Sequence, residues 1–348
     1  MTIEPCKVVR SIAGLPSVGF SDLPVAMQQR IARYRTAAKA DNTTRTYAAQ
    51  FRQFQTWCGR QGLAATLPVP AVLAAAWLTD RADHGASRAT IAVACAALKA
   101  AHADADVAFE GDDPLLLSTM QGLRRTLIQP QRQVAPLKSD LLAALLTNAG
   151  DTDRGIRNAA LVASLYAFGF RRSELAGLDY AVLGGGSGVI IVQATTINVM
   201  LAKSKNRHAT VKHSSIQRDA NPLAFAAIER WVKHADIGKG TPFMRRLVAH
   251  GGIGGRLTGG CIARIVKNAV LRHLVVTGTP LDQAIEIAAT FSGHSGRIGL
   301  VVSAKEAGAS DSAIASATRH KNLAMVARYG EQADLIQTTP HKLPGVGV

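Results

Sequence analysis

A polar, proline-bearing segment at residues 129–136 divides the chain into two stretches of different periodicity. Before it, apolar residues recur only at helical spacing; Tyr47, Phe51 and Phe54, for example, step by four and three. After it, helical patterns alternate with short β-prone runs. Polar segments with proline are typical of linkers, and 348 residues suffice for about two domains. We expect a helical domain over 20–129, a linker over 130–138 and a second domain over 139–348.

The first stretch predicts an all-helical domain. Asn42 or Thr43 is a suitable N-cap for the helix that contains Tyr47 and Trp57. Asp113-Pro114 is a second helix start, with a cap followed by proline in the first turn. The expected helices cover residues 22–39, about 42–57, 70–81, 87–102 and 113–127.

The second stretch predicts a mixed domain. Ser139 or Asp140 caps a leucine-rich helix, and residues 156–168 form another. Two β-prone runs follow the glycines at 184–188, and they predict a small antiparallel sheet over about 188–213. Helical patterns resume at residue 221, around a glycine-rich loop at 251–260. The expected fold class is mainly α with a small antiparallel β-sheet.

The net charge of +16 and the pI near 10.2 predict a polyanionic partner. Between Asp179 and Asp219 there is no acidic residue at all. Basic runs without acids often meet phosphate, although lysines also protect the solvated edge of a hairpin. The basic residues of this run include Lys203, Lys205, Arg207 and Lys212.

Several classes of protein do not fit the sequence. No run of about 18 apolar residues predicts a transmembrane helix, and residues 1–10 lack the apolar core of a signal peptide. No basic amphipathic or lipidation signal indicates a membrane partner. The cysteines Cys6, Cys58, Cys95 and Cys261 are widely spaced, which favours neither disulfides nor a zinc site. We expect reduced thiols, a bacterial cytoplasmic location and no metal.

Five residues whose side chains can act on a phosphodiester follow one another along the second stretch. Arg171 lies in Gly169-Phe170-Arg171-Arg172-Ser173-Glu174-Leu175, and His294-x-x-Arg297 follows. His320 comes 320 − 297 = 23 residues after Arg297, and Tyr329 comes 329 − 320 = 9 residues after His320. Two arginines, two histidines and a tyrosine can bind a phosphodiester, neutralise its developing charge and attack it. With the positive charge, this set predicts DNA as the substrate.

These motifs resemble those of the tyrosine recombinase (phage integrase) family. Phe168 to Leu175 is similar to the first arginine box, and Ser292 to Arg297 is similar to the second, most of all to the form in bacteriophage P1 Cre recombinase. Ala317 to Asn322 and Val326 to Tyr329 are similar to the closing histidine and nucleophile segments. Ala202 to Lys205 resembles the lysine-bearing hairpin. The resemblance implies a helical core-binding domain and a mixed α/β catalytic domain.

The resemblance gives each residue a role. Arg171 and Arg297 clamp the non-bridging oxygens of the phosphate, because a guanidinium matches a phosphate in a bidentate way. Tyr329 is the nucleophile and forms a covalent 3′-phosphotyrosine, which conserves the bond energy for rejoining. A phosphoryl transfer of this kind depends mostly on positioning and charge.

The remaining roles are those of proton transfer and orientation. His294 accepts the phenol proton or binds the phosphate, and His320 donates a hydrogen bond to the phosphate in the transition state. Lys203 is the general acid for the leaving oxygen, with Lys205 as the alternative. Glu174 orients the site, or is only an acid at a helix N-terminus.

The resemblance also implies partners. The expected substrate is double-stranded DNA with specific recombination sites, bound by a homotetramer. No cofactor, metal or nucleotide is expected, and accessory proteins are unknown. The expected location is the bacterial nucleoid. Only 348 − 329 = 19 residues follow Tyr329, so a segment such as 332–336 forms at most a short docking helix. Arg172 stands where the family usually has an apolar residue. The DNA contacts expected outside the catalytic set are Arg45, Arg52, Arg88, Lys99, Lys205 and Arg207.

Two other functions fit parts of this pattern. A type IB topoisomerase uses similar residues but acts on one duplex without pairing sites. A non-catalytic regulator derived from a recombinase binds DNA without cleaving it. The short linker and the helical first domain favour the recombinase.

Overall fold

A computed structural model of the chain describes residues 22–38, 41–127, 134–201, 211–248, 252–320 and 322–329. The chain divides after residue 131 into two compact units, each with its own hydrophobic core. The first is called the helical unit below, and the second the catalytic unit. The domain limits given above stay a prediction.

The helical unit contains only helices in its described part. They are α1 (Val25–Ala38), α2 (Asp41–Arg60), α3 (Ala71–Asp83), α4 (Arg88–Asp104) and α5 (Pro114–Thr126). The Asp113 side chain accepts hydrogen bonds from two backbone N–H groups of α5, as its sequence predicts. Helix α2 begins at Asp41, so Asn42 and Thr43 lie inside its first turn rather than before it.

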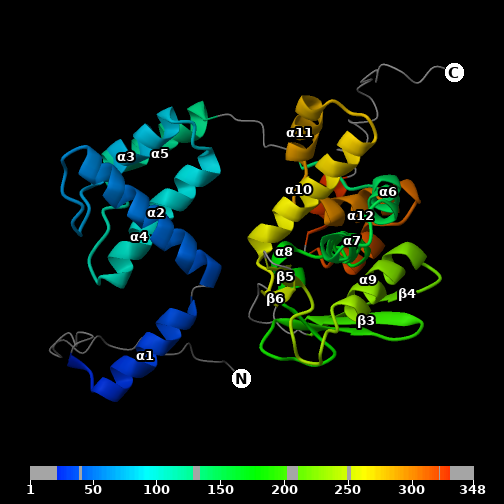
Figure 1. The fold of residues 1–348 in the computed structure, drawn as a ribbon. Coiled ribbons are helices and arrows are strands. Elements are labelled where there is room, and N and C mark those ends of the chain that lie inside the picture. The colour runs from blue at the N-terminus through cyan, green and yellow to red at the C-terminus, as the bar shows by residue number, and fades with distance from the viewer. Residues whose placement is uncertain are drawn as a thin grey trace, which may run out of the picture. The chain divides into compact units, whose positions relative to one another are not determined.

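Aromatic packing holds the helical unit together. Phe54 of α2 meets Trp77 of α3 edge to face, with ring centroids 5.3 Å apart, and both are fully buried. Helices α2 and α4 pack against each other (Figure 1). Their outward faces are therefore held in a fixed relation within this unit.

The catalytic unit is built around α7. Its helices are α6 (Ser139–Thr147), α7 (Asp153–Ala167), α8 (Arg172–Ala176), α9 (Pro222–His234), α10 (Gly259–Val276), α11 (Leu281–Thr290), α12 (Ser295–Glu306) and α13 (Asp311–Thr318), followed by helical residues 323–329. Helix α7 is buried on nearly every side and contacts α6, α9, α10 and α12. Figure 1 shows α9 between α7 and the sheet. Ser139 and Asp140 lie inside α6, because that helix begins one residue after Lys138.

The sheet is mixed rather than purely antiparallel. Its strands are β1 (Leu178–Tyr180), β2 (Gly188–Val192), β3 (Thr196–Leu201) and β4 (Lys212–Gln217), in that order. Strands β2, β3 and β4 pair antiparallel, as expected, but β1 pairs parallel with β2. Parallel pairing requires the chain to return to the same end of the sheet. Buried Asp179 holds the return loop by accepting hydrogen bonds from the backbone of Gly184 and Gly186.

The glycine-rich region at 251–260 is more ordered than a loop in its described part. Strands β5 (Arg245–Leu247) and β6 (Ile253–Arg256) form a second, two-stranded sheet. Thr258 then caps α10, which starts at Gly259. The sequence predicted a glycine-rich loop here, and that prediction was wrong. Glycine is unfavourable within strands, but it does not prevent two short strands from pairing in a hairpin.

Candidate active site

The five predicted core residues lie at helix ends, although they are far apart in sequence. Arg171 directly precedes α8, His294 directly precedes α12, and Arg297 is in the first turn of α12. His320 lies just beyond α13, and Tyr329 ends the helical segment 323–329. Arg171 and Tyr329 are 329 − 171 = 158 residues apart. Hydrogen bonds, a ring contact and mutual charge effects nevertheless connect all five.

Glu174 holds Arg171 in place. The Arg171 backbone N–H donates to Glu174 Oε2 over 2.9 Å, and Arg171 Nη1 donates to Glu174 Oε1 over 2.7 Å. Burial acts to raise the pKa of Glu174, but the hydrogen bond from the Arg171 backbone and the charge of Arg319 outweigh it and hold that pKa below its ordinary value. Glu174 is thus a carboxylate that orients Arg171. The Arg171 side chain keeps 41% of its surface exposed, so it can bind a further anion.

Arg297 is buried and has one donor group left over. Its Nε donates to His320 Nε2 over 3.2 Å, and its Nη1 donates to the Gly169 carbonyl over 2.7 Å. The Nη2 atom is buried and has no hydrogen-bond partner among the described residues. Burial, then the charge of Arg171, lowers the pKa of Arg297 to about 10, which leaves it charged at neutral pH. Buried N–H donors are nearly always satisfied, so the free Nη2 is suited to an anion.

His320 has a defined tautomer. Thr318 Oγ1 donates to the Ile314 carbonyl over 2.5 Å, so this hydroxyl can only accept from His320 Nδ1, 2.6 Å away. The proton of the neutral ring is therefore on Nδ1, and the Nε2 lone pair accepts from Arg297. Burial, followed by the charges of Arg297 and Arg171, lowers the pKa of His320 to about 4. A pKa of about 4 leaves His320 neutral at physiological pH.

His294 lies beside a second, unpredicted arginine. A Cβ built on Gly293 would meet Arg172 Cγ at 2.3 Å, so the Arg172 side chain crosses Gly293 where only glycine leaves room. His294 keeps an exposed surface, yet desolvation and the charges of Arg172 and Arg297 lower its pKa. A neutral His294 can accept a proton.

Tyr329 of the same chain reaches this cluster. Its ring centroid lies 5.9 Å from that of His320, and it packs beside the buried residues Val301, Ile314 and Val326. Tyr329 also acts electrostatically on Arg297, which places the phenol near the guanidinium. The site therefore contains its candidate nucleophile in cis.

Other predicted residues lie elsewhere or are not described. Lys203, Lys205 and Arg207, and the segment 332–336, lie outside the described residues. Arg45 and Arg52 of α2 and Arg88 and Lys99 of α4 are all exposed. Spacings of 52 − 45 = 7 and 99 − 88 = 11 residues put each pair on one face of its helix.

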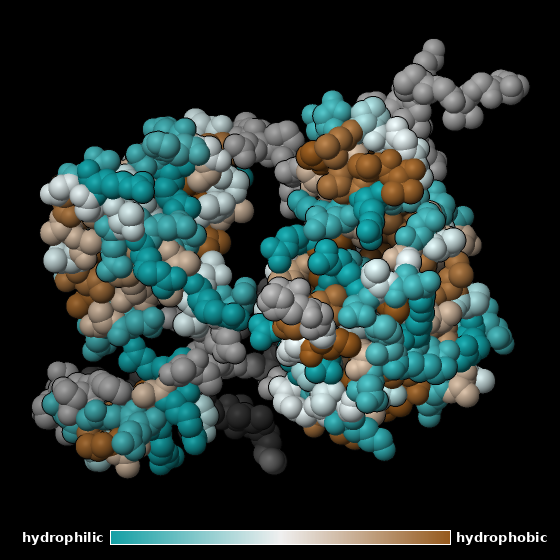
Figure 2. All heavy atoms as spheres, in the orientation of Figure 1, coloured by the Kyte–Doolittle hydropathy of each residue, from teal (hydrophilic) through white to brown (hydrophobic). Residues whose placement is uncertain are grey.

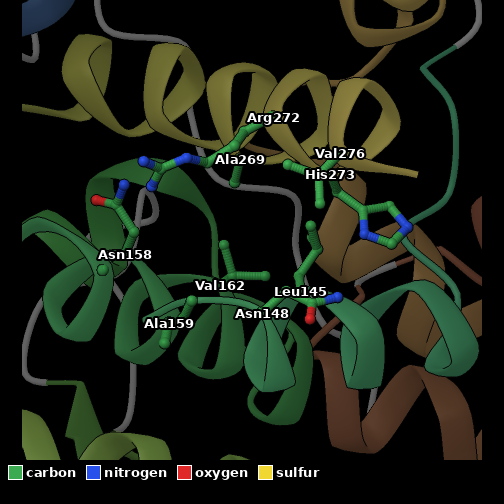
Figure 3. Close-up of a pocket in the computed structure, with 11 residues that line it drawn as sticks. Leu145, Asn148, Asn158, Ala159, Val162, Ala269, Arg272, His273 and Val276 are labelled. Atoms are coloured by element: carbon green, nitrogen blue, oxygen red, sulfur yellow. The ribbon is translucent and has the colours of Figure 1, made fainter. Parts of the chain in front are cut away.

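A separate cavity lies between α6, α7 and α10 (Figure 3). It has a volume of about 100 Å³ and is lined partly by Asn148, Asn158, Arg272 and His273. None of the predicted site residues lines it. Among the described residues no group of acids, histidines and cysteines could hold a metal ion, and no described helix is long and apolar enough to cross a membrane.

Comparison with known proteins finds relatives among recombinases. A scan of protein-family models found no match. An integrase/recombinase XerD homologue of Selenomonas ruminantium is 29% identical over 308 residues, which cover 86% of this chain and 84% of the relative. A tyrosine recombinase XerC of Mycobacterium sp. (strain KMS) is 34% identical over 148 residues, 40% of this chain and 47% of that relative. The chain is thus similar in sequence to integrase/recombinase XerD and tyrosine recombinase XerC proteins.

Solved structures of integrases and of a site-specific recombinase are similar to this chain in fold. The Tn1549 transposon integrase in complex with transposon right-end DNA matches with a TM-score of 0.54 at 18% identity, over 89% of this chain and 97% of that chain. XerH bound to palindromic difH matches with a TM-score of 0.51 at 14% identity, over 84% and 77%. A lambda integrase dimer bound to a core site matches with a TM-score of 0.50 at 13% identity, over 92% and 79%. The chain has the tyrosine recombinase fold, with a core-binding and a catalytic domain.

One prediction for this chain is not tested, and two site residues were not foreseen. The special likeness of its second arginine box to Cre stays a prediction. Arg172 and Arg319 both belong to the site, yet sequence reasoning did not assign either to it. Arg319 was quoted only as the neighbour of His320, and its partners Glu174 and Ser214 are 145 and 105 residues away. No local sequence signal reports such contacts.

Proposed function

We propose that this chain is a site-specific DNA recombinase that cleaves and rejoins strands through a covalent 3′-phosphotyrosine intermediate. The observation that carries the proposal is the buried Arg297 guanidinium, whose Nη2 has no hydrogen-bond partner in the described part of the chain and which lies near the charge of Arg171 and the phenol of Tyr329. A non-bridging phosphate oxygen supplies the missing acceptor. Among the described residues, the cluster brings together Arg171, Arg172, Arg297 and Arg319 with one carboxylate, Glu174, and this excess of positive charge favours a bound anion.

Arg171 and Arg297 together clamp the scissile phosphate. Arg171 is held by Glu174 and partly exposed, whereas Arg297 is buried and held by Gly169 and His320. Both are oriented before the substrate arrives, so little reorganisation is needed when charge develops in the transition state.

The covalent step follows from these positions. Tyr329 transfers its proton to His294, which is neutral and therefore able to accept it. The phenolic oxygen then attacks phosphorus. The bond to the 5′-oxygen breaks, and that oxygen takes a proton from the general acid, for which Lys203 is our first choice and Lys205 the second. In the return step a 5′-hydroxyl attacks the phosphotyrosine and releases Tyr329. No nucleotide is consumed, because one phosphodiester replaces another.

His320 changes its hydrogen bonding during this cycle. In the free site its Nε2 accepts from Arg297 and cannot donate. A bound phosphate adds negative charge beside the ring and raises the pKa of His320. The protonated ring then donates from Nε2 to the phosphate, which is the role proposed from the sequence.

The helical unit supplies DNA contacts away from the chemistry. The exposed basic faces of α2 and α4, with Arg45, Arg52, Arg88 and Lys99, are suited to phosphates. Such contacts set the register on the duplex rather than read its sequence. The overall charge of +16 adds attraction that weakens as salt increases.

Strand exchange further requires assembly, and we propose a homotetramer on paired sites in the bacterial cytoplasm. An apolar patch at the end of α10 and the start of α11 supports protein contacts: Val276, Leu281 and Ile285 are 72%, 61% and 51% exposed. Brown surface is visible over these helices in Figure 2. The XerH and Tn1549 integrase structures are complexes with DNA, which supports DNA as the substrate class.

The test is covalent trapping. Nicked duplexes tiled across the DNA that flanks the gene are incubated with the protein, and adducts are scored on denaturing gels. The wild type forms an adduct on at least one duplex, Tyr329→Phe forms none, and the control Tyr180→Phe behaves as the wild type. An adduct with Tyr329→Phe would refute the assigned nucleophile.

The same preparations separate the alternatives. Relaxation of any supercoiled plasmid without recombinants indicates a type IB topoisomerase. A sequence-specific mobility shift without cleavage indicates a regulator. Recombinant products from two matched sites support the proposal.

A further inference from the structure

Arg319 is an unusual residue for its place in the fold. It follows α13 with φ 59° and ψ 39°, in the left-handed region that disfavours side chains with a Cβ. Only 5% of its side chain is exposed. A buried arginine in a strained backbone conformation persists only where its contacts compensate for both costs.

The contacts of Arg319 join three separate segments. Its Nη2 donates to the Phe168 carbonyl over 2.9 Å and to the Gly169 carbonyl over 3.4 Å, both in the turn before Arg171. The same Nη2 lies 3.4 Å from Glu174 Oε2 in α8. Its Nη1 donates to Ser214 Oγ of β4 over 3.0 Å. One guanidinium therefore connects the turn, α8 and β4.

Two of these partners also hold the phosphate-clamping arginines. The Gly169 carbonyl accepts from Arg297 Nη1 as well as from Arg319 Nη2. Glu174 binds Arg171 through Oε1 and Arg319 through Oε2. Arg319 thus contacts the group that fixes Arg171 and the group that fixes Arg297. Moving it would loosen both clamps at once.

The contact with β4 ties the main sheet to the turn before Arg171. Ser214 pairs with Val199 of β3. Arg319 therefore fixes β4, at Ser214, to the carbonyl groups of Phe168 and Gly169.

We infer that Arg319 is a positioning residue that sets the geometry of Arg171 and Arg297 without touching the substrate. The predicted effect on the cleavage rate rests on the proposed function. The predicted effect on the positions of Arg171 and Arg297 does not. It assigns a catalytic consequence to a buried side chain whose Nη1 and Nη2 groups bind protein groups, while its buried Nε has no partner among the described residues. The effect on rate comes through alignment, to which phosphoryl transfer is sensitive.

The main test compares Arg319→Gly and Arg319→Lys with the control Arg230→Ala, which removes an exposed arginine of α9. Glycine accepts the left-handed backbone and so relieves strain while it removes the guanidinium. At saturating nicked duplex, we expect Arg319→Gly to slow adduct formation by about 100-fold, the scale of an ångström-level misalignment. Arg319→Lys gives an intermediate rate, since lysine keeps the charge but lacks the planar set of donors.

Two further measurements distinguish positioning from a merely structural role. The Kd for the duplex changes by less than about threefold in Arg319→Gly, because a buried arginine releases no counterions. The unfolding midpoint falls by less than about 5 °C. If Arg319→Gly forms the adduct within about threefold of the wild-type rate, the inference is refuted. It is also refuted if the loss of rate is fully explained by a smaller folded fraction or by weaker DNA binding.

A double mutant sharpens the test. If Arg319 acts partly through Glu174, then Arg319→Gly slows a Glu174→Gln protein much less than it slows the wild type. Equal fold-changes in the two backgrounds would show that the Glu174 contact carries none of the effect, and would overturn this part of the inference.

One arm needs no DNA, so it is independent of the proposed function. The Arg297 Nε–H bonded to His320 gives an NMR signal protected from exchange with water in the full-length chain. We expect that protection to be lost in Arg319→Gly and kept in Arg230→Ala. Unchanged protection in Arg319→Gly would contradict the structural link. Absence of any wild-type adduct would instead refute only the proposed function.

Discussion

His320 makes the catalytic unit sensitive to mild acid. Its ring is neutral in the folded site because burial, Arg297 and Arg171 lower the pKa of His320 to about 4. In the unfolded chain an imidazole has a pKa of about 6.5. Between these values the unfolded state binds more protons than the folded state, so stability is lost as the pH falls through this window.

The size of the effect follows from the two pKa values. At pH 5 the unfolded imidazole is almost fully protonated, whereas the folded one is about one-tenth protonated. Linkage gives about 2 kcal/mol of lost stability relative to pH 7, and solvent screening of a partly exposed ring reduces this to about 1 kcal/mol. His320→Gln retains a side-chain acceptor for Arg297 and a donor for Thr318, but it does not titrate.

The assay has a direct and an energetic arm. An NMR titration of histidine rings, assigned by difference with His320→Gln, should place one pKa far below the others. Between pH 7 and pH 5 the wild type should lose about 1 kcal/mol more unfolding free energy than His320→Gln. An ordinary pKa for His320, or equal losses in the two proteins, would refute both the tautomer and the Arg297 contact.

Two further predictions concern the framework of the site. Gly299→Ala in α12 should destabilise the chain by about 1–3 kcal/mol, because its Cβ would lie 1.8 Å from the Leu137 carbonyl oxygen. As the control, Gly122→Ala in α5 should stabilise the chain by about 0.5–1 kcal/mol, because no described atom lies within 4 Å of the added Cβ. Urea unfolding of both variants measures this, and an unaffected Gly299→Ala would disprove the close approach. Asp179→Asn should cost about 2–3 kcal/mol at pH 7, since it weakens a buried bond to Arg256 and the loop to Gly184 and Gly186. Asp311→Asn, an exposed partner of Lys305, should cost under about 1 kcal/mol, and equal losses in the two variants would contradict the buried role.

Local patterns in the sequence predicted much of the secondary structure. Stretches rich in alanine and leucine indicated α3 and α4, and the apolar run 156–168 indicated α7. Asp113-Pro114 indicated where α5 begins. The β-prone runs indicated β2 and β3. These features depend on neighbours within a few residues, which a single sequence displays directly.

Other features depended on contacts that no local pattern records. The parallel pairing of β1 with β2 required Asp179 to hold the return loop. The pairing of β5 with β6 in a glycine-rich region was missed for the same kind of reason. Helix starts at Asp41 and Ser139 differed by one or two residues from the caps expected. In each case tertiary packing outweighed residue preference.

The sequence by itself determined the chemical types of the site. The order and spacing of Arg171, His294, Arg297, His320 and Tyr329, with a net charge of +16, already indicated phosphodiester chemistry on DNA. Only the tertiary structure decided how these groups are held. The tautomer of His320 depends on Thr318 and on Arg297, which is 23 residues away. The sharing of Glu174 and Gly169 with Arg319 joins residues that are 145 and 150 positions apart. Hydrogen-bond geometry of this kind exists only after the chain has folded, because loop closure brings distant donors and acceptors together.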